Sequence, residues 1–522
     1  MRPFFSNIAD KIRRYFASPK KALSVLRSLP GVSVIRRSPL FDREWYLAQN
    51  PDVRVAGSDP ALHYLFCGHS AKRDPGPDFC GEEYLALNPA ARASSLNPLV
   101  HYEKYGRESG AKRSEHTLLT LPEQQKSFAR KIAAIREKVS HNGKIKVLFF
   151  VTTPSIFPAR PLFEAMLHDP SFTPRIVVIP DLRWPDKPYQ TQMDHCLEEL
   201  GKDFSREYIT GAKCDVGGLW ETETNNADIV CYPMPYDLSS YKYNPRYALE
   251  GDFLPVYVNY GYPCTRFAID VMHLDNYAVF WKVFLENEYT AETYNEASVI
   301  GGINGVITGC VKLDRLASLG NLRQSNRKTL LICPHHSVEG GLNNLLALSN
   351  FLRLADYFKD LPARFPDIDF IFRPHPFLIK TLSSPKFWGE RKVAAYRAAL
   401  VANRNLTWSD APDYLREFAI SDGIIQDCAS FTVEYAYTGK PCCYILKTPD
   451  DIAKKFLPIG QDTLKSCYQA YTAEDIDQFI SNVILNGKDP FRNARLDFCK
   501  KIMTNFPHAT ETALKLIKSA IM

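Results

Sequence analysis

The stretch SDGIIQDCASFTVEYAYTGKPCCYIL (residues 421–446) contains a complete strand–helix–strand pattern. Two apolar runs, GIIQD (423–427) and PCCYIL (441–446), predict buried strands. The residues between them predict a helix that carries Glu434 and ends at Gly439, because glycine commonly closes helices. Two buried strands joined by a helix usually pair in parallel within one sheet. The stretch therefore predicts an α/β fold.

The same alternation of apolar strands and helical stretches begins at Lys144 and continues through most of the chain. The predicted strands are 147–151, 175–180, 228–233, 256–261, 279–286 and 305–309 in the first half, and 329–336, 369–376, 406–410, 423–427 and 441–446 in the second. A polar stretch at 317–328 separates the halves and is typical of a linker. We therefore expect two Rossmann-like domains facing a cleft, at 144–320 and 321–522, with ligands at the strand ends.

Composition supports a globular protein of several domains. The chain has 522 residues, of which 45% are apolar and 23% are charged, a mix typical of folded domains. No apolar run reaches the roughly 18 residues that a membrane-spanning helix needs. The 13 cysteines include no C-x-x-C pair, which favours reduced thiols. The glycine-rich loops of ATPases and NAD-binding enzymes are also absent from the sequence.

Positive charge gathers near the N-terminus. Residues 1–37 carry nine Lys or Arg and one acid, so the rest of the chain sums to −2 against a net charge of +6. That balance does not suggest nucleic-acid binding by the body of the protein. We expect 1–38 to be a basic amphipathic segment on an anionic membrane surface, which would place a cytoplasmic protein peripherally on the inner face of the membrane. The alternatives are a solvated tail and a helix packed on the body.

Residues 41–68 and 79–106 form an internal repeat with a constant offset of 38. Twelve of the 28 aligned positions are identical, which indicates a duplicated unit. Each unit predicts a short helix, a turn at a proline and a second helix closed by glycine. His63 and His101 are equivalent positions, and we expect packed or capping residues there, because neither unit supplies further metal ligands.

We expect this repeat module, 39–115, to bind a protein partner, and 116–143 to be a helical linker to the body. The F-D-x-x-[WY]-Y-L pattern of its first unit resembles a repeat found beside bacterial polysaccharide-assembly transferases.

Arg373-Pro374-His375-Pro376 follows one of the predicted strands of the second half. Arginine offers a planar fork for phosphate oxygens, and histidine can hold a proton or donate to a developing anion. Two prolines make the corner rigid. The alternative is a strand-end turn with a structural histidine.

A second candidate cluster follows the strand at 423–427. Asp427, Ala429 and Ser430 precede a predicted helix whose backbone N–H groups could face a diphosphate. The Ser430 hydroxyl adds a donor, and Glu434 could accept from ribose hydroxyls. The alternative is that Asp427 and Ser430 only cap the helix.

The order of these motifs resembles the CDP-glycerol:poly(glycerophosphate) glycerophosphotransferase family, which has a GT-B fold and builds teichoic-acid and capsule polymers. An R-x-H-P strand end lies some fifty residues before D-x-[SA]-S-x-x-x-[DE]-Y, and GVITGCVKLDRL (305–316) resembles the family's [VI]-x-G-x-x-x-x-D stretch. The resemblance covers roughly 145–515.

The resemblance implies that a polymer hydroxyl attacks the glycerol-bearing phosphate of a CDP-activated donor and that cytidine monophosphate leaves. His375 would be a catalytic or phosphate-contacting residue and Arg373 a phosphate contact. Asp427, Ser430 and Glu434 would hold the nucleotide. No cofactor is certain, although Mg²⁺ could accompany the donor diphosphate. The acceptor would be a polymer or a lipid-linked chain.

The chain departs from the family's pattern at several positions. The family's W-H-G-x-P is Asn259-Tyr260-Gly261-Tyr262-Pro263 here, so Tyr260 stands where a basic histidine is usual, and tyrosine is a poor base at neutral pH. One serine of the family's pair is Ala429. Two alternatives follow: a nucleotide-sugar-dependent glycosyltransferase and a non-catalytic scaffold of a polysaccharide-assembly complex.

A further loop begins Cys333-Pro334-His335-His336-Ser337 and continues with glycines. His335 or His336 could supply proton chemistry in place of the missing histidine, and Ser337 and Gly340 could cradle a phosphate. The alternative is an ordinary polar loop.

Overall fold

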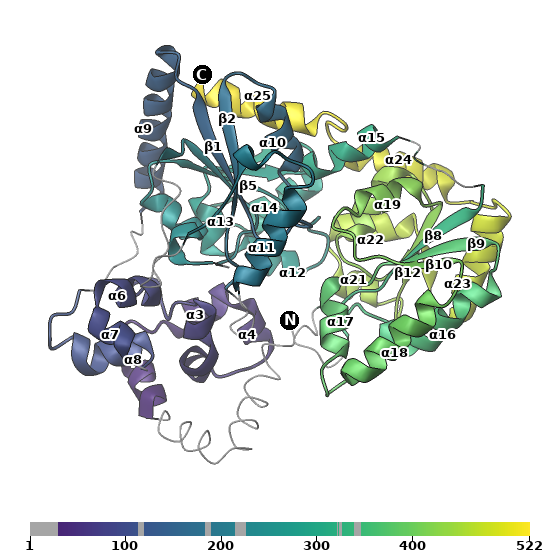
Figure 1. Cartoon of the computed structure of the whole chain (residues 1–522), viewed down its shortest axis with the longest axis horizontal. Coiled ribbons are helices and arrows are strands. Elements are labelled where there is room, and N and C mark those ends of the chain that lie inside the picture. The colour runs from purple at the N-terminus through teal and green to yellow at the C-terminus, as the bar shows by residue number, and fades with distance from the viewer. Residues whose placement is uncertain are drawn as a thin grey trace.

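The computed structural model describes residues 30–522 except 95, 113–118, 183–188, 214–225, 238, 321, 323–325 and 339–345. Figure 1 shows a small helical module beside two α/β domains. Most of the basic segment 1–38 lies outside the described residues, so its membrane contact stays a prediction. In the described part of the chain, no helix is both long and apolar enough to cross a bilayer.

The first α/β domain contains a seven-stranded parallel sheet in the order β3-β2-β1-β4-β5-β6-β7. Its strands are β1 (Ile145–Val151), β2 (Phe172–Val178), β3 (Ile209–Gly211), β4 (Ile229–Tyr232), β5 (Leu254–Val258), β6 (Lys282–Leu285) and β7 (Gly305–Ile307). The order reverses direction between β1 and β4, as in a doubly wound Rossmann fold.

The second domain repeats this order in a six-stranded parallel sheet, β10-β9-β8-β11-β12-β13. Its strands are β8 (Lys328–Cys333), β9 (Ile368–Phe372), β10 (Leu406–Trp408), β11 (Gly423–Gln426), β12 (Cys442–Ile445) and β13 (Tyr468–Ala470). The two sheets confirm the predicted α/β class with two Rossmann-like domains. Strands β3 and β13 were not predicted, because Ile209–Gly211 and Tyr468–Ala470 are too short and too polar to form an apolar run.

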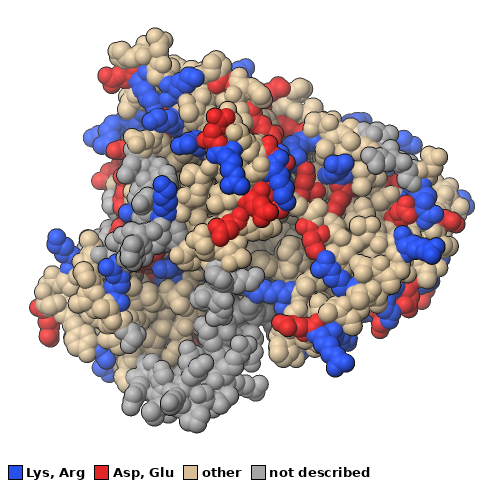
Figure 2. Space-filling view, in the orientation of Figure 1, with Lys and Arg blue, Asp and Glu red and all other residues tan. Residues whose placement is uncertain are grey.

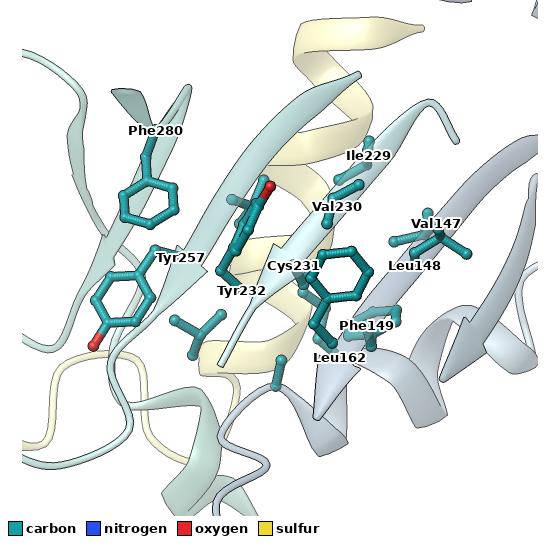
Figure 3. Close-up of a cluster of buried hydrophobic side chains, with 14 of the residues drawn as sticks. Val147, Leu148, Phe149, Leu162, Ile229, Val230, Cys231, Tyr232, Tyr257 and Phe280 are labelled. Carbon is teal, nitrogen blue, oxygen red and sulfur yellow. The ribbon is translucent and has the colours of Figure 1, made fainter. Parts of the chain in front are cut away.

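The core of the first domain explains why its strands read as unbroken apolar runs. All residues of β4 and β5, and all of β1 except Lys146, are buried, because helices cover both faces of the sheet. Figure 3 shows Phe149, Tyr232 and Tyr257, from the adjacent strands β1, β4 and β5, within this cluster of buried side chains. Tyr257 and Phe280 stack with ring centroids 5.3 Å apart.

The helices lie in three groups. They are α3 (Arg43–Gln49), α4 (Pro51–Val55), α5 (Pro60–His63), α6 (Gly81–Leu87), α7 (Pro89–Ala93) and α8 (Pro98–His101) in the module; α9 (Leu121–Ser140), α10 (Arg160–Leu167), α11 (Tyr189–Leu200), α12 (Phe267–Met272), α13 (Asp275–Val279), α14 (Glu288–Ala297) and α15 (Arg315–Leu319) with the first domain; and α16 (Phe351–Arg364), α17 (Pro376–Leu382), α18 (Gly389–Val401), α19 (Leu415–Ile420), α20 (Phe431–Glu434), α21 (Asp451–Lys455), α22 (Pro458–Lys465), α23 (Ala473–Gln478), α24 (Arg492–Ile502) and α25 (Ala509–Ile521) in the C-terminal part.

Two helices extend the first domain beyond its predicted limits. The predicted linker is helix α9, whose Ile135 packs in the first core and whose Lys131 Nζ donates to the Ala248 carbonyl at 3.2 Å. The last helix, α25, also returns to this domain, where Ala513 and Ile517 are buried in the same core beside α10 (Figure 1). The sequence predicted that the second domain extends to residue 522. It ends before α25, because that helix packs in the core of the first domain.

The two units of the repeat module make equivalent contacts. The Tyr46 hydroxyl lies 2.8 Å from His63 Nδ1, and the Tyr84 hydroxyl lies 2.8 Å from His101 Nδ1, so both histidines are packed residues, as expected. A Cβ at Gly68 would overlap the Tyr46 hydroxyl. The identities between the units thus preserve packing.

One local prediction for the module is wrong. We expected Pro51 to mark a turn, but Pro51 begins helix α4, because proline's missing N–H is not needed at the first helical position. The module is fixed to the first domain by Trp45, whose Nε1 donates to Asp275 at 2.8 Å and whose ring lies 4.6 Å from the Arg246 guanidinium. Figure 2 shows positive and negative side chains mixed over the visible face of the α/β domains.

Candidate active site

The carboxyl edge of the second sheet is where the topology predicts a ligand. The strand order reverses between β8 and β11, and ligands of open α/β sheets bind at such a switch point. His335 and His336 follow β8, His375 follows β9, and Asp427 directly follows β11. Tertiary structure therefore brings together residues that the sequence presents in three separate motifs.

Three histidine rings form a compact cluster at this edge. The ring centroids of His336 lie 4.2 Å from His335 and 4.3 Å from His375, and those of His335 and His375 are 5.5 Å apart. His335 is buried, whereas His336 and His375 are half-buried. We call these three residues the histidine cluster.

Hydrogen bonds from the loops at this sheet edge hold His335 and His375 in place. Asp427 accepts the backbone N–H of His335 at 2.6 Å, and the backbone N–H of His375 donates to the Pro334 carbonyl at 3.0 Å. His335 Nδ1 lies 2.7 Å from the Ser337 hydroxyl. Asp427, which the sequence analysis selected as a candidate site residue, therefore holds the loop of His335 through a hydrogen bond.

The neutral form of His375 has a defined tautomer. Its Nδ1 accepts the backbone N–H of Phe377 at 3.1 Å and caps helix α17. The ring proton must then lie on Nε2, because a ring nitrogen that accepts a hydrogen bond carries no proton. His375 can thus donate one hydrogen bond through Nε2. It can bind a second proton, on Nδ1, only if it loses the hydrogen bond from the Phe377 backbone.

Burial sets the charge state of the site. It lowers the pKa of all three histidines below their ordinary value, and the proximity of the rings acts in the same direction for His335 and His336. Burial also raises the pKa of Asp427 to about 6, against its hydrogen bonds with Asn350 and His335. Neutral imidazoles can donate to phosphate oxygens, and a bound anion would favour their protonation.

Arg373 lies beside the cluster but makes its contacts within the second domain. Its guanidinium donates to Glu417 at 3.0 Å, to the Ser409 hydroxyl at 3.2 Å and to the Ala411 carbonyl at 2.7 Å. The structure thus gives Arg373 a bracing contact, and its contact with phosphate stays a prediction.

The start of helix α20 faces the first domain. Cys264 Sγ lies 3.1 Å from the Ala429 carbonyl, and a Cβ at Gly261 would lie 3.5 Å from Ser430 Cβ. The two domains therefore meet where Gly261 and Ser430 were predicted to contact substrate. The Ser430 side chain makes no capping hydrogen bond to helix α20.

Glu434 belongs to a buried network between the domains that sequence analysis did not detect. Its side chain accepts from Lys312 Nζ at 2.8 Å, from the Tyr414 hydroxyl at 2.5 Å and from the Tyr262 backbone at 3.3 Å. Its predicted contact with ribose stays a prediction, since these protein donors contact both carboxylate oxygens. The one sequence signal for Lys312 was its position within the 305–316 motif.

Tyr260 is half-buried at the end of β5, with its hydroxyl 3.3 Å from that of Tyr236. Its backbone carbonyl accepts from Lys312 Nζ at 2.9 Å. Gly340 lies outside the described residues. Within the described ranges, no three His, Cys, Asp or Glu side chains are grouped to hold a metal ion, and Mg²⁺ carried by a donor stays a prediction.

The two sheets define a two-domain α/β protein of GT-B-like architecture. Among solved structures, the chain is similar to the wall teichoic acid polymerase TagF soaked with CDPG, at 13% identity and a TM-score of 0.48, over 77% of this chain and 98% of that one. It is also similar to UDP-GlcNAc 2-epimerase from Neisseria meningitidis bound to UDP-GlcNAc, at 11% identity and a TM-score of 0.42, over 72% and 100%. No family model and no curated protein matches the sequence. None of these comparisons supports the resemblance stated for the repeat module.

Proposed function

We propose that the protein is a transferase that moves glycerol phosphate, or a related polyol phosphate, from a CDP-activated donor to a hydroxyl of a growing cell-surface polymer. The observation that carries the proposal is the histidine cluster at the switch point of the second sheet, a sheet edge whose Ser430 meets Gly261 of the first domain. The order of the sequence motifs around His375 and Asp427 supports the same reaction.

In this proposal the donor diphosphate lies against the histidine cluster. His375 Nε2 donates to a phosphate oxygen, and His336 contacts the same group. The acceptor hydroxyl attacks the phosphorus that bears the polyol, a new P–O bond forms, and the bond to the departing nucleoside monophosphate breaks. The hydroxyl proton passes to His336, whose neutral ring can accept it. Catalysis then depends on alignment of the reactants and on stabilisation of charge at the phosphate.

The assigned contacts of the remaining site residues are part of the proposal. Ser337 and Gly340 belong to the phosphate-binding loop that follows His336, and Ser430 donates to the nucleotide. Asp427 acts through the backbone of His335, which makes it a positioning residue. Residues 1–37 hold the protein on the inner membrane surface, and the repeat module contacts a protein partner.

Glycosyl transfer from a nucleotide-sugar is the second candidate. Tyr260 favours it, because the family's basic histidine is absent from this position and a glycosyltransferase does not require it. Both candidates use the same site residues, so only the donor separates them.

A donor panel tests the proposal. The full chain is incubated with CDP-glycerol, CDP-ribitol, UDP-sugars and GDP-sugars, together with a polyol-phosphate acceptor, and products are measured by mass spectrometry. We expect transfer from a CDP-polyol and a rise in melting temperature with CDP. Transfer only from a sugar nucleotide would select the second candidate, and no transfer or stabilisation with any donor would favour a scaffold.

A further inference from the structure

We propose that Lys312, Glu434 and Tyr414 form a positioning unit that aligns the Tyr260–Gly261 loop of the first domain with the Arg373–His375 corner of the second. The inference rests on the proposed function for its catalytic consequence, but its structural part can be tested without activity. None of the three residues need touch substrate.

Lys312 connects the two domains from a position just after the last strand of the first domain. It lies in the helical turn Val311–Asp314 that follows β7, and its Nζ donates to the Tyr260 carbonyl at 2.9 Å and to Glu434 at 2.8 Å. One ammonium group therefore contacts the loop that follows β5 and the helix that follows β11.

Tyr414 continues the connection towards the histidine cluster. Its hydroxyl donates to Glu434 at 2.5 Å, and its ring lies 5.5 Å from Lys312 Nζ and 5.7 Å from the Arg373 guanidinium. Arg373 is held by Glu417 and separated from His375 by a single proline. The path from Tyr260 to His375 thus begins at a backbone carbonyl, passes through four side chains that end with Arg373, and continues along the chain to His375.

The side chains of the network are largely buried, which favours a role in positioning the domains over a role in stabilising the surface. The Glu434 side chain is fully buried and that of Lys312 is 14% exposed. A buried ion pair recovers little net stability after desolvation, but it strongly disfavours arrangements that leave either charge unpaired. The pair therefore restricts the domains to arrangements in which Lys312 and Glu434 meet.

A second buried carboxylate, Glu286, also faces this region. Lys312 lies close enough to act on Glu286 electrostatically, together with the phenols of Tyr262 and Tyr437 and the thiol of Cys310. Glu434 nevertheless accepts the Lys312 hydrogen bond, so the carboxylate that pairs with Lys312 lies across the domain boundary and not in the first domain.

The test compares Lys312→Met with Lys138→Met in the full chain. Lys138 pairs with Asp228 at 2.6 Å within the first domain, away from the domain boundary, and is the matched control. Hydrogen–deuterium exchange is measured for peptides covering 257–266. We expect faster exchange there in Lys312→Met and no change in Lys138→Met; equal exchange in both variants would overturn the positioning unit.

Kinetics of the same variants test the catalytic consequence. With the donor found active in the panel, Lys312→Met should lower kcat at least tenfold and change the donor KM less than about threefold, because misalignment affects the reaction more than donor binding. Tyr414→Phe, which removes one hydroxyl, should lower kcat by a smaller factor, and Lys312→Arg should restore part of the loss. An unchanged kcat in Lys312→Met would overturn the proposal. If the wild-type chain transfers from no donor, the proposed function fails, while the exchange measurement still decides the structural part.

Discussion

The two α/β domains share one strand order but differ at the edges where ligands bind. At the second sheet, hydrogen bonds with Asp427, Ser337 and Phe377 hold His335 and His375, although Nδ1 of His336 is buried without a partner among the described residues. At the first sheet, Glu286 Oε2 and Asn259 Nδ2 are buried and have no hydrogen-bond partner of good geometry among the described residues. The difference teaches that the fold supplies equivalent positions, whereas the residues at the strand ends decide which edge is rigidly organised for chemistry.

The largest expected effect tests the organised edge. His375→Asn keeps a side-chain acceptor for the N-cap of α17 but removes the Nε2 donor. We expect transfer to fall by roughly 10²–10⁴ and the melting temperature to change little. His508→Asn, at an exposed histidine paired with Glu511, is the matched control and should keep full activity. Full transfer by His375→Asn would show that the second edge is not the reacting one.

A middle-sized effect concerns the first edge. Burial raises the pKa of Glu286 to about 7 from an ordinary 4.5, with Lys312 acting against it. The folded state thus holds a proton that the unfolded state releases, so this residue's favourable contribution is complete below about pH 4.5 and is lost as the pH rises through about 7. Glu286→Gln removes that loss.

We therefore expect Glu286→Gln to raise the free energy of unfolding by about 1–3 kcal/mol at pH 8 and to leave it nearly unchanged at pH 4.5. Urea denaturation at both pH values measures the effect. Glu292→Gln, at an exposed position of α14, is the control. If the free energy of unfolding rises equally at both pH values, then altered packing, and not the removal of a buried charge, explains the effect of Glu286→Gln.

The smallest effect concerns the contact between the edges. Gly261 faces Ser430, and a Cβ there would lie at ordinary van der Waals distance from it. We expect Gly261→Ala to change the unfolding free energy by less than about 0.5 kcal/mol. Thermal melting measures stability, and transfer assays measure activity. A large loss of stability would show that the edges are packed more tightly than described; a loss of transfer alone would place substrate beside Gly261.

Sequence patterns predicted most of the long elements and missed those that depend on distant partners. The runs that became β1 and β8 are apolar on both faces, and parallel strands covered by helices must be so. Strand β13 and the return of α25 to the first domain carry no such local signal, because both depend on surfaces formed far away in sequence. The domain limit at residue 522 failed for this reason.

The candidate site divides in the same way. His335, His336 and His375 were each singled out from local motifs, yet their meeting depends on the pairing of β8 with β9 and β11. Lys312 and Glu434 are 122 residues apart, and no local pattern distinguishes this pair from an exposed one.

By itself the sequence determined the class of fold, the duplicated module and the residues with chemical potential, because periodicity, glycine and proline positions and residue type act locally. Only the tertiary structure decided which of those residues meet, that Arg373 and Glu434 bind protein groups, and how the first domain contacts the second. The physical reason is that burial, pKa and hydrogen-bond partnership belong to the packed environment of a side chain, and that environment is assembled from segments far apart in the chain.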